Sequence, residues 1–252
     1  MGTMNLAGRV ALVTGSTRGL GRSMAFALGR AGARVALNFQ NDQSTADRAF
    51  SAYQEAGLDG MLVRGDITDP AEVERAIAEI TAQLGPVDIL VPNATCAQPM
   101  EPIEGYDWQA YQRMIDFFVK SPFLLTRACL PHMKRQRWGR IINICTTAFV
   151  AGKPIFSAYV AAKGGQVGMS RSLASELAPF GITVNMVSPG WIPVERHAGD
   201  PQEAKDAYRA RIPIGRLGVP DDVGGAVVFF ASEASSFVTG QNINVNGGVT
   251  IG

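Results

Sequence analysis

The sequence predicts a doubly wound α/β fold, in which a parallel sheet carries helices on both faces. Short apolar runs rich in β-branched residues alternate with longer stretches of helical spacing along the whole chain. A glycine-rich turn, Gly15 to Gly21, follows the first apolar run and leads into a helix. The 252 residues suit one large domain, 1–252, and no linker, repeat or low-complexity tract divides them.

The first half of the chain repeats the strand–helix unit three times and then begins a fourth. Arg9 to Thr14 is a short run of apolar, partly β-branched residues, which favours a buried strand. The expected strands are 9–14, 35–39, 60–65 and 87–91, and the expected helices follow Gly21, span about 44–56, and run from a cap at 66–70 to about 84.

The second half continues the alternation with longer helices. A helical region is expected from Asp107 to Gln136 with an interruption near Pro122, and another is expected to open at Ser157. The remaining elements are expected at 140–145, 182–187 and 242–246 for strands and at 221–232 for a helix. The longest irregular stretch, 191–214, is expected to be a lid over the substrate.

Composition and charge exclude several classes of protein. Apolar residues make up 46% of the chain and charged residues 18%, as in soluble globular proteins. The formal charge of +1 offers no basic surface for nucleic acid. No apolar run approaches the length of a membrane span, and Met1 to Gly8 lacks the apolar core of a signal peptide.

The cysteines and histidines predict neither a metal centre nor a disulfide framework. Cys96, Cys129 and Cys145 are widely spaced and odd in number, which favours a reducing, cytoplasmic location. His132 and His197 are expected to be structural or surface residues. A catalytic triad built on histidine is therefore not expected.

The glycine turn points to nucleotide binding. Where a strand, a glycine turn and a helix follow one another, backbone N–H groups and the positive end of the helix can hold a pyrophosphate. Gly15, Gly19 and Gly21 have the spacing G-x-x-x-G-x-G, which differs from the common G-x-G-x-x-G. A plain turn between a strand and a helix remains the alternative, but the flanking strand and helix favour the nucleotide.

Tyr159 and Lys163 are the candidate catalytic pair. At positions i and i+4 of a helix they share one face, and an ammonium beside a phenol lowers the pKa of that phenol. The phenol could then exchange a proton near neutral pH. The alternative is a packed tyrosine and a solvated lysine. Convergence favours catalysis, because the polar or glycine-bearing ends of several expected strands meet at one edge of the sheet: the glycine turn, Asp66, Asn93, Thr146 and Pro189-Gly190.

Together these residues resemble the short-chain dehydrogenase/reductase family over nearly the whole chain, about Leu6 to Gly248. The chain is most similar in appearance to 3-oxoacyl-carrier-protein reductases and their paralogues that act on sugars, polyols and cyclic ketones. The matching segments are TGSTRGLG at 14–21, Asp66-Ile67, Asn93-Ala94, YVAAK at 159–163, Pro189-Gly190 and VNGG at 245–248.

The resemblance implies a single-domain Rossmann-type fold and hydride transfer between a nicotinamide and a carbonyl or secondary alcohol substrate. It implies that Tyr159 is the general acid or base and that Lys163 holds the ribose and lowers the tyrosine pKa. Thr146 would take the place of the family's serine and polarise the substrate oxygen. Phe149 and Trp191 are expected to line the substrate pocket with Thr146 and Tyr159.

The resemblance also implies the cofactor contacts and the assembly. Family members usually form dimers and tetramers through two long helices and the last strand, so a homotetramer is expected, and the apolar stretch Val223 to Phe230 would be costly to expose. The implied cofactor-binding residues are Gly15, Ser16, Thr17, Arg18, Gly19, Leu20, Asn38, Asp66, Ile67, Asn93, Ala94, Tyr159, Lys163, Pro189, Gly190 and Ile192.

The sequence departs from the family pattern in and around the expected site. Phe118 stands where an asparagine usually binds the water that links the lysine to solvent, and Thr95 replaces a glycine beside the cofactor. Pro92 replaces an asparagine, and Val194 replaces the usual threonine that holds the carboxamide. An alternative function follows from Phe118 and Thr95, namely a nucleotide-binding protein with reduced or no dehydrogenase activity.

The choice of cofactor depends on the end of the second expected strand. Members that prefer NAD carry an acid there for the ribose hydroxyls, and Asn38-Phe39-Gln40 contains none. Arg18 can pair with a 2′-phosphate, so NADP is favoured and NAD remains possible. Asp42 lies slightly further along and could alter this preference.

Overall fold

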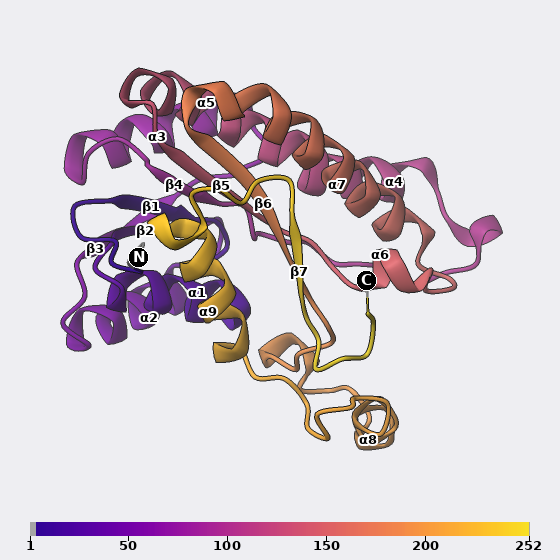
Figure 1. The fold of residues 1–252 in the computed structure, drawn as a ribbon. Helices are drawn as coiled ribbons and strands as arrows, with labels where there is room; N and C mark the ends of the chain where they lie inside the picture. The colour runs from indigo at the N-terminus through magenta and orange to yellow at the C-terminus, as the bar shows by residue number, and fades with distance from the viewer. Residues whose placement is uncertain (1–3, 252) are drawn as a thin grey trace.

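A seven-stranded parallel sheet forms the centre of the protein, as the sequence predicts. The computed structural model describes residues 4–251, and the strand order is β3-β2-β1-β4-β5-β6-β7 (Figure 1). The strands are β1 (Val10–Val13), β2 (Arg34–Phe39), β3 (Gly60–Arg64), β4 (Ile89–Val91), β5 (Gly139–Ile144), β6 (Ile182–Pro189) and β7 (Asn242–Val245).

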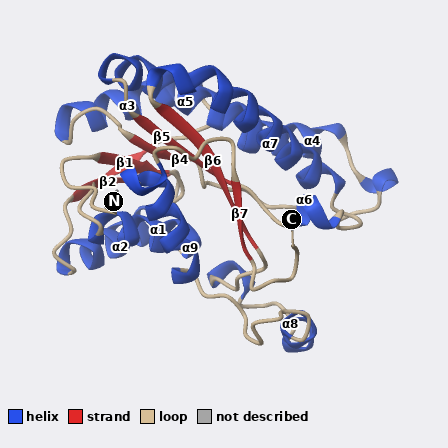
Figure 2. Cartoon of the chain, in the orientation of Figure 1, coloured by secondary structure: helices blue, strands red, loops and turns tan. Residues whose placement is uncertain are grey.

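Helices cover both faces of the sheet, so the expected doubly wound arrangement is confirmed (Figure 2). One face carries α1 (Gly19–Arg30), α2 (Gln43–Glu55) and α9 (Asp221–Ala231), and the other carries α3 (Pro70–Gln83), α5 (Ser121–Gln136) and α7 (Ser157–Leu177). The shorter helical segments are η1 (Ile103–Gly105), α4 (Trp108–Ile115), η2 (Asp116–Lys120), α6 (Ala148–Ala151), η3 (Ala178–Phe180), η4 (Glu195–His197), α8 (Gln202–Arg209) and η5 (Glu233–Ser235).

The central strands are buried throughout, and this fixes their register. Every residue of β5 and β6 is buried, and the two strands pair in parallel from Gly139 with Ile182 to Ile144 with Val187. β1 lies between β2 and β4, so the winding direction of the chain reverses beside the glycine turn. Ligands of such sheets bind at the carboxyl ends of the strands near this reversal.

The long helical region near residue 118 differs from the prediction in one respect. It is not broken at Pro122, because Pro122 lies in the first turn of α5, where a missing N–H is tolerated. The irregularity comes earlier, since η2 (Asp116–Lys120) is a π-helical segment between α4 and α5. Such π segments are frequent at functional sites, and this one contains Phe118.

The start of α7 also differs in detail. Ser157 is its first helical residue, but the cap position is Phe156, and no side chain caps the helix there. The Ser157 hydroxyl lies 2.7 Å from the Tyr111 hydroxyl instead. The serine therefore joins α7 to α4 and does not cap its own helix.

The expected irregular stretch 191–214 contains η4 and the helix α8. All eight residues of α8 are at least partly exposed, and the helix lies below the end of β7, away from the sheet (Figure 1). Its residues are mostly polar and charged, so the sequence lacks the apolar periodicity that reveals a packed helix. The segment therefore has a secondary structure that the sequence did not indicate.

Candidate active site

The glycine turn is fixed to the end of β4 by the residues that follow each strand. Thr14 comes directly after β1, and its hydroxyl accepts the backbone N–H groups of Asn93 (2.9 Å) and Ala94 (3.0 Å). The Asn93 amide donates to the carbonyls of Thr14 (2.9 Å) and Gly15 (3.1 Å). Asn93 thus orients the turn with its side chain.

Two glycines are required by close approach. A side chain on Gly15 would lie 2.8 Å from the Ala94 Cα, and Gly15 has a positive φ of 59°. A Cβ on Gly21 would meet the Gly15 carbonyl oxygen. The first turn of α1 has no acidic residue, and its cap residue, Arg18, makes no side-chain cap bond. The N–H groups and positive dipole at this helix end therefore suit a pyrophosphate.

Asn38 lies under the turn and not at its surface. The Asn38 side chain is 4% exposed. Its Oδ1 accepts the Gly15 N–H at 3.3 Å, and its amide donates to the Gly65 carbonyl at 3.1 Å. Asn38 therefore joins the glycine turn to the end of β3, and Gln40 is the polar side chain at the end of β2 that reaches outward.

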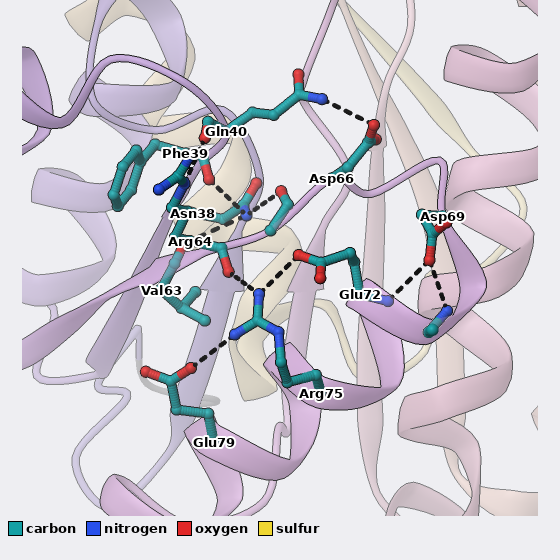
Figure 3. A network of polar contacts seen from close by, with 12 residues as sticks. Asn38, Phe39, Gln40, Val63, Arg64, Asp66, Asp69, Glu72, Arg75 and Glu79 are labelled. Carbon is teal, nitrogen blue, oxygen red and sulfur yellow. Dashed lines mark hydrogen bonds and ion pairs between the residues drawn. The ribbon is translucent and has the colours of Figure 1, made fainter.

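Figure 3 shows the polar contacts around the ends of β2 and β3. The Gln40 amide donates to Asp66 Oδ2 at 2.7 Å, while Asp66 Oδ1 accepts the Thr68 N–H at 2.8 Å. Arg64 Nε donates to the Gln40 carbonyl at 3.0 Å, which brings a guanidinium to the end of β2. The sequence reasoning missed Arg64, although a basic residue near the end of the expected strand 60–65 was a usable signal.

Asp42 belongs to helix α2. Its carboxylate accepts the Thr45 N–H at 3.0 Å and the Ser44 hydroxyl at 3.0 Å. The hydrogen bonds from Thr45, followed by that from Ser44, lower the Asp42 pKa below its ordinary value. The carboxylate that could have altered the cofactor preference thus caps a helix.

The two expected catalytic side chains lie on the buried face of α7, beside the end of β5. Tyr159 stacks on Phe156 with 4.6 Å between ring centroids, and it meets Phe118 edge-on at 5.2 Å. Burial raises the pKa of Tyr159 to about 12, although a hydrogen bond with Thr146 and the charge of Arg196 oppose that rise. The pKa shift is therefore opposite to the lowering that the sequence predicts, because burial outweighs the nearby charges. Thr146 follows β5, and its hydroxyl accepts the Ala148 N–H at 3.1 Å.

Lys163 is buried, and its ammonium has three close partners. Nζ donates to the Ile144 carbonyl at 2.6 Å and to Gln166 Oε1 at 2.9 Å. The Phe118 ring centroid lies 4.0 Å from Nζ, so Phe118 faces Lys163. Burial lowers the pKa of Lys163 from 10.5 to about 8. This direction agrees with the expected desolvation of the ammonium.

Gln166 is a second residue that sequence reasoning missed. It lies three positions after Lys163, so the two share a helix face, and a polar residue at a buried position was a usable signal. Ser121 is a polar residue at the start of α5. Its buried hydroxyl has no hydrogen-bond partner within residues 4–251, and it lines a small cavity with Lys163, Gln166, Phe118, Thr14 and Asn93.

The segment 191–214, the expected lid, is attached to the sheet immediately after β6. The Gly190 N–H donates to the Val245 carbonyl at 2.9 Å, and the Trp191 N–H donates to the Tyr208 hydroxyl of α8 at 2.9 Å. Val194 lies against the glycine turn, because a Cβ on Gly19 would be 3.5 Å from the Val194 side chain. This part of the segment 191–214 therefore lies beside the turn where α1 begins.

The remaining predicted site residues are distributed around this edge. Phe149 is exposed on α6 and packs toward Gly164 of α7, whereas Trp191 packs edge-on against Tyr208 at 5.4 Å. Thr95 is exposed, and its hydroxyl accepts the Gln98 amide at 2.7 Å. Four other predicted cofactor residues are buried, namely Ser16, Thr17, Ile67 and Ile192. Leu20 lies in the first turn of α1, and Pro189 is the last residue of β6.

The described part of the chain contains neither a cluster of metal-binding side chains nor a helix suited to a membrane. Between residues 4 and 251, no group of three or more His, Cys, Asp or Glu side chains is placed to hold a metal ion. Within the same residues, no helix has the length and apolar character needed to cross a membrane. The fold and the side chains at the strand ends define a dinucleotide-binding α/β protein with a tyrosine–lysine pair.

Comparison with known proteins gives the family. The family model described as enoyl-(acyl carrier protein) reductase, a short-chain dehydrogenase/reductase model, matches residues 15–250. The 3-oxoacyl-[acyl-carrier-protein] reductase FabG of Escherichia coli is 36% identical over 246 residues, which covers 98% of this chain and 99% of that protein. A 2-dehydro-3-deoxy-D-gluconate 5-dehydrogenase of Formosa agariphila is 35% identical over 252 residues, covering 97% and 94%.

A solved structure of a dehydrogenase has the same fold as this chain. The gluconate 5-dehydrogenase from Burkholderia cenocepacia, in complex with NADP and tartrate, has a TM-score of 0.91 and 32% identity, covering 98% of this chain and 96% of that one. This chain belongs to the short-chain dehydrogenase/reductase family and is an NAD(P)-dependent oxidoreductase.

Proposed function

We propose that this oxidoreductase uses NADP(H) to interconvert a small polar carbonyl compound and its secondary alcohol. The observation that carries the proposal is the position of Tyr159 and Lys163 on one face of α7. Lys163 lines the same cavity as Thr14 and Asn93, which hold the glycine turn. A proton donor and a nucleotide-binding turn thus lie at one edge of the sheet.

The proposed roles follow from these contacts. Tyr159 gives a proton to the carbonyl oxygen in reduction and takes it back in oxidation. The Thr146 hydroxyl polarises that oxygen, and Lys163 holds the ribose and favours the phenolate. The nicotinamide cofactor, when bound, supplies or accepts the hydride. Asn93 and Asn38 keep the glycine turn in the shape that accepts the pyrophosphate.

Two arginines support a preference for NADP over NAD. Arg18 is exposed at the start of α1, and Arg64, the last residue of β3, reaches the Gln40 carbonyl just after β2. A guanidinium can make two parallel hydrogen bonds to a phosphate. Asp42, the nearby carboxylate that would favour the ribose hydroxyls of NAD, is engaged as the cap of α2. Gluconate 5-dehydrogenase from Burkholderia cenocepacia, which has the same fold, is in complex with NADP.

The substrate proposed is a polar compound with a negative charge. Burial raises the pKa of Tyr159, and the charge of Arg196 opposes that rise, so this guanidinium is close enough to act on the site. Arg196 forms no ion pair within residues 4–251. Its Nε lies 3.2 Å from His197 Nε2 and leaves the rest of the fork for a carboxylate. Related proteins named for gluconate and its 2-dehydro-3-deoxy derivative act on acids of this kind.

A nucleotide-binding protein with weak or no dehydrogenase activity remains the second candidate. Phe118 favours it, because an aromatic ring at Lys163 cannot carry protons to solvent. Thr95 favours it less, since its hydroxyl bonds with Gln98 at an exposed position. The tyrosine, lysine and hydroxyl at their expected positions favour catalysis.

A substrate screen decides between the two functions. Purified protein is mixed with NADPH or NADH and keto acids, uncharged ketones and thioesters, and the absorbance of the reduced cofactor is followed. We expect turnover with NADPH and keto acids, and a KM that rises for the acids alone in Arg196→Ala. Tight cofactor binding without turnover of any substrate would support the nucleotide-binding protein.

We further infer that the chain forms a homotetramer with two-fold symmetry. We also infer a reducing compartment, because Cys96, Cys129 and Cys145 form no disulfide. The apolar stretch Val223 to Phe230, expected to be costly to expose in a monomer, does not support the assembly. Val223, Val227 and Phe230 are fully buried within the chain, because α9 packs on α1 and the sheet. The exposed rings of Trp108, at the start of α4, and Phe123, on α5, support an interface instead. Light scattering at micromolar concentration should give four chains, and a monomer would contradict the assembly.

A further inference from the structure

Gln166 is a buried glutamine whose amide faces the ammonium of Lys163. It is 1% exposed and lies on the inner face of α7. Its Oε1 accepts a hydrogen bond from Lys163 Nζ at 2.9 Å, and Cys145 Sγ lies 3.6 Å from the same oxygen. Burying an amide costs free energy unless it is hydrogen-bonded. Here the compensating partner is the proposed catalytic lysine.

The Lys163 ammonium has three N–H groups and three protein partners. The Ile144 carbonyl is the last of β5, and the Ile144 N–H is itself bonded to the Pro92 carbonyl, so this acceptor is fixed by the sheet. The Phe118 ring offers a π face but neither donates nor accepts a proton. Gln166 is thus the polar side chain, among the contacts to Nζ, that holds the ammonium.

We propose that Gln166 is a positioning residue, whose amide oxygen holds the Lys163 ammonium at the end of β5 in the charged form that acts on Tyr159. The inference rests on the role proposed above for Lys163. An acceptor at 2.9 Å stabilises the protonated amine, and it also prevents Nζ from turning along α7. Gln166 therefore partly replaces the polar environment that the Phe118 ring excludes.

A buried pair one turn further along α7 shows what a merely structural polar contact looks like. The Asn143 amide donates to the Ser170 hydroxyl at 2.9 Å, and that hydroxyl donates to the Gln166 carbonyl at 2.7 Å. The pair joins β5 to α7 as Gln166 does, but neither side chain hydrogen-bonds to Lys163. Ser170→Ala is therefore a matched control for loss of a buried polar contact at this junction.

The titratable groups around Lys163 come from four segments. Tyr159 is on its own helix, Cys145 follows β5, Cys96 follows β4, and Arg196 is in the lid segment. Removing the Gln166 acceptor leaves all four in place. A change in the behaviour of Lys163 in a Gln166 variant can then be assigned to the amide.

The first measurement needs no substrate. Competitive labelling of amines with acetic anhydride, read by mass spectrometry, gives the pH midpoint at which Lys163 becomes reactive, with Lys120 and Lys153 as exposed references. We expect Gln166→Leu to lower that midpoint by about one pH unit, because one acceptor of the ammonium is lost. Gln166→Glu should raise it, since a carboxylate favours the charged amine. Ser170→Ala should leave it unchanged.

The second measurement uses the reaction. In Gln166→Leu the pH profile of kcat for alcohol oxidation should move toward alkaline pH, because a less charged lysine leaves the phenol with a higher pKa. Ser170→Ala should lower thermal stability without moving the profile. An unchanged labelling midpoint in both Gln166 variants would overturn the proposal. If Gln166→Leu does not fold, an unchanged midpoint in Gln166→Glu is sufficient to overturn it.

The two measurements separate this inference from the proposed function. A protein that turns over no substrate but shows the shifted labelling midpoints would refute the proposed reaction and retain the contact between Gln166 and Lys163. A protein that turns over keto acids with unshifted midpoints would keep the reaction and assign Gln166 to packing.

Discussion

Two buried cations lie at opposite ends of β5, and they are compensated differently. Arg140, at the amino end, is 2% exposed and has a carboxylate partner in Glu233 at 3.6 Å. Its guanidinium also donates to the Gly139 carbonyl at 3.0 Å and lies 4.3 Å from the Trp138 ring centroid. Lys163, at the carboxyl end, is 5% exposed and has a carbonyl, an amide and a ring, but no carboxylate partner within residues 4–251.

This difference separates a structural cation from a functional one. Burial lowers the pKa of both groups, and Glu233 opposes that change at Arg140. The ordinary pKa of a guanidinium is so high that Arg140 stays charged, and the Glu233 carboxylate balances this charge. Burial brings the pKa of Lys163 to about 8, and this ammonium has no carboxylate partner within residues 4–251. Its Nζ lies 5.9 Å from the Tyr159 ring centroid, and its proposed role is to favour the phenolate. A buried cation left without a carboxylate is thus a candidate for function.

The largest effect should come from removing the group on which Lys163 acts. Tyr159→Phe should lower turnover by roughly 10²–10⁴-fold and change cofactor affinity only a few-fold, because it removes the proton donor and keeps the ring. Steady-state kinetics and cofactor titration measure the two quantities. Tyr53→Phe is the matched control, since Tyr53 is also fully buried but lies between α1 and β3. Near wild-type turnover in Tyr159→Phe would show that Tyr159 is not the proton donor and that Lys163 is not a functional cation acting through it.

The second test compares the two cations by the pH dependence of stability. The folded pKa of Lys163 is about 8 and its ordinary value 10.5, so between these pH values the unfolded chain binds more protons. The wild type should therefore gain stability relative to Lys163→Met as pH rises from 8 to 10.5, by up to roughly 3 kcal/mol. Melting temperatures of both proteins across this range measure the gain.

Arg140→Met supplies the contrast. The guanidinium stays protonated over the same range, so the difference in stability between the wild type and Arg140→Met should not depend on pH. This variant should also keep its turnover, because Arg140 lies at the far end of β5 from Tyr159. A similar pH dependence in both variants would break the distinction between the two cations.

An exposed cation extends the comparison. Arg18 makes no side-chain cap bond at α1 and is proposed to meet the 2′-phosphate of NADP. Arg18→Ala should reduce the preference for NADPH over NADH roughly ten- to hundred-fold, the effect of one charge-assisted hydrogen bond. Fluorescence titration with both cofactors measures it. Arg22→Ala is the control, because Arg22 lies on the same helix over the Phe26 ring. Equal affinity of the wild type for both cofactors would refute the assignment.

The parallel sheet, the alternation of strands with helices and the sheet edge expected to carry the site could be predicted from the sequence, because each follows from local patterns. Apolar runs and the glycine turn fix the strand ends, and the i, i+4 spacing of Tyr159 and Lys163 fixes their common face. Asn38 shows the limit of such reasoning. The resemblance implies a cofactor contact for Asn38, whereas the burial of its side chain beneath the turn and its bonds to Gly15 and Gly65 depend on the fold.

The features that could not be predicted depend on contacts between distant segments. The amide of Gln166 has a reason to be buried only when Lys163 and the end of β5 lie beside it. Helix α8 has no apolar stripe, and the bond from Trp191 to Tyr208 that ties it to β6 joins residues 17 apart in sequence. The π-helical form of η2, which contains the buried Phe118, is a further feature that the sequence does not indicate.

The smallest and most specific effect should come from Phe118. Its ring centroid is 4.0 Å from Lys163 Nζ and 5.2 Å from the Tyr159 ring, so it separates both groups from any polar medium on that side. Phe118→Asn puts an amide oxygen near the ammonium and admits water. The Lys163 pKa should rise and the Tyr159 pKa should fall, because the charged lysine favours the phenolate.

The expected result is a pH profile for alcohol oxidation that shifts to lower pH by about half a unit to one unit, with a rate near pH 7 raised about five-fold. Ketone reduction should change less, since it starts from the neutral phenol. Phe118→Leu is the control, because it keeps the site apolar and should not shift the profile downward. Ser121 is the competing proton carrier, and its unpartnered hydroxyl lines the same cavity. If the profile moves in Ser121→Ala but not in a folded Phe118→Asn, the relay runs through the serine, and Phe118 contributes packing alone.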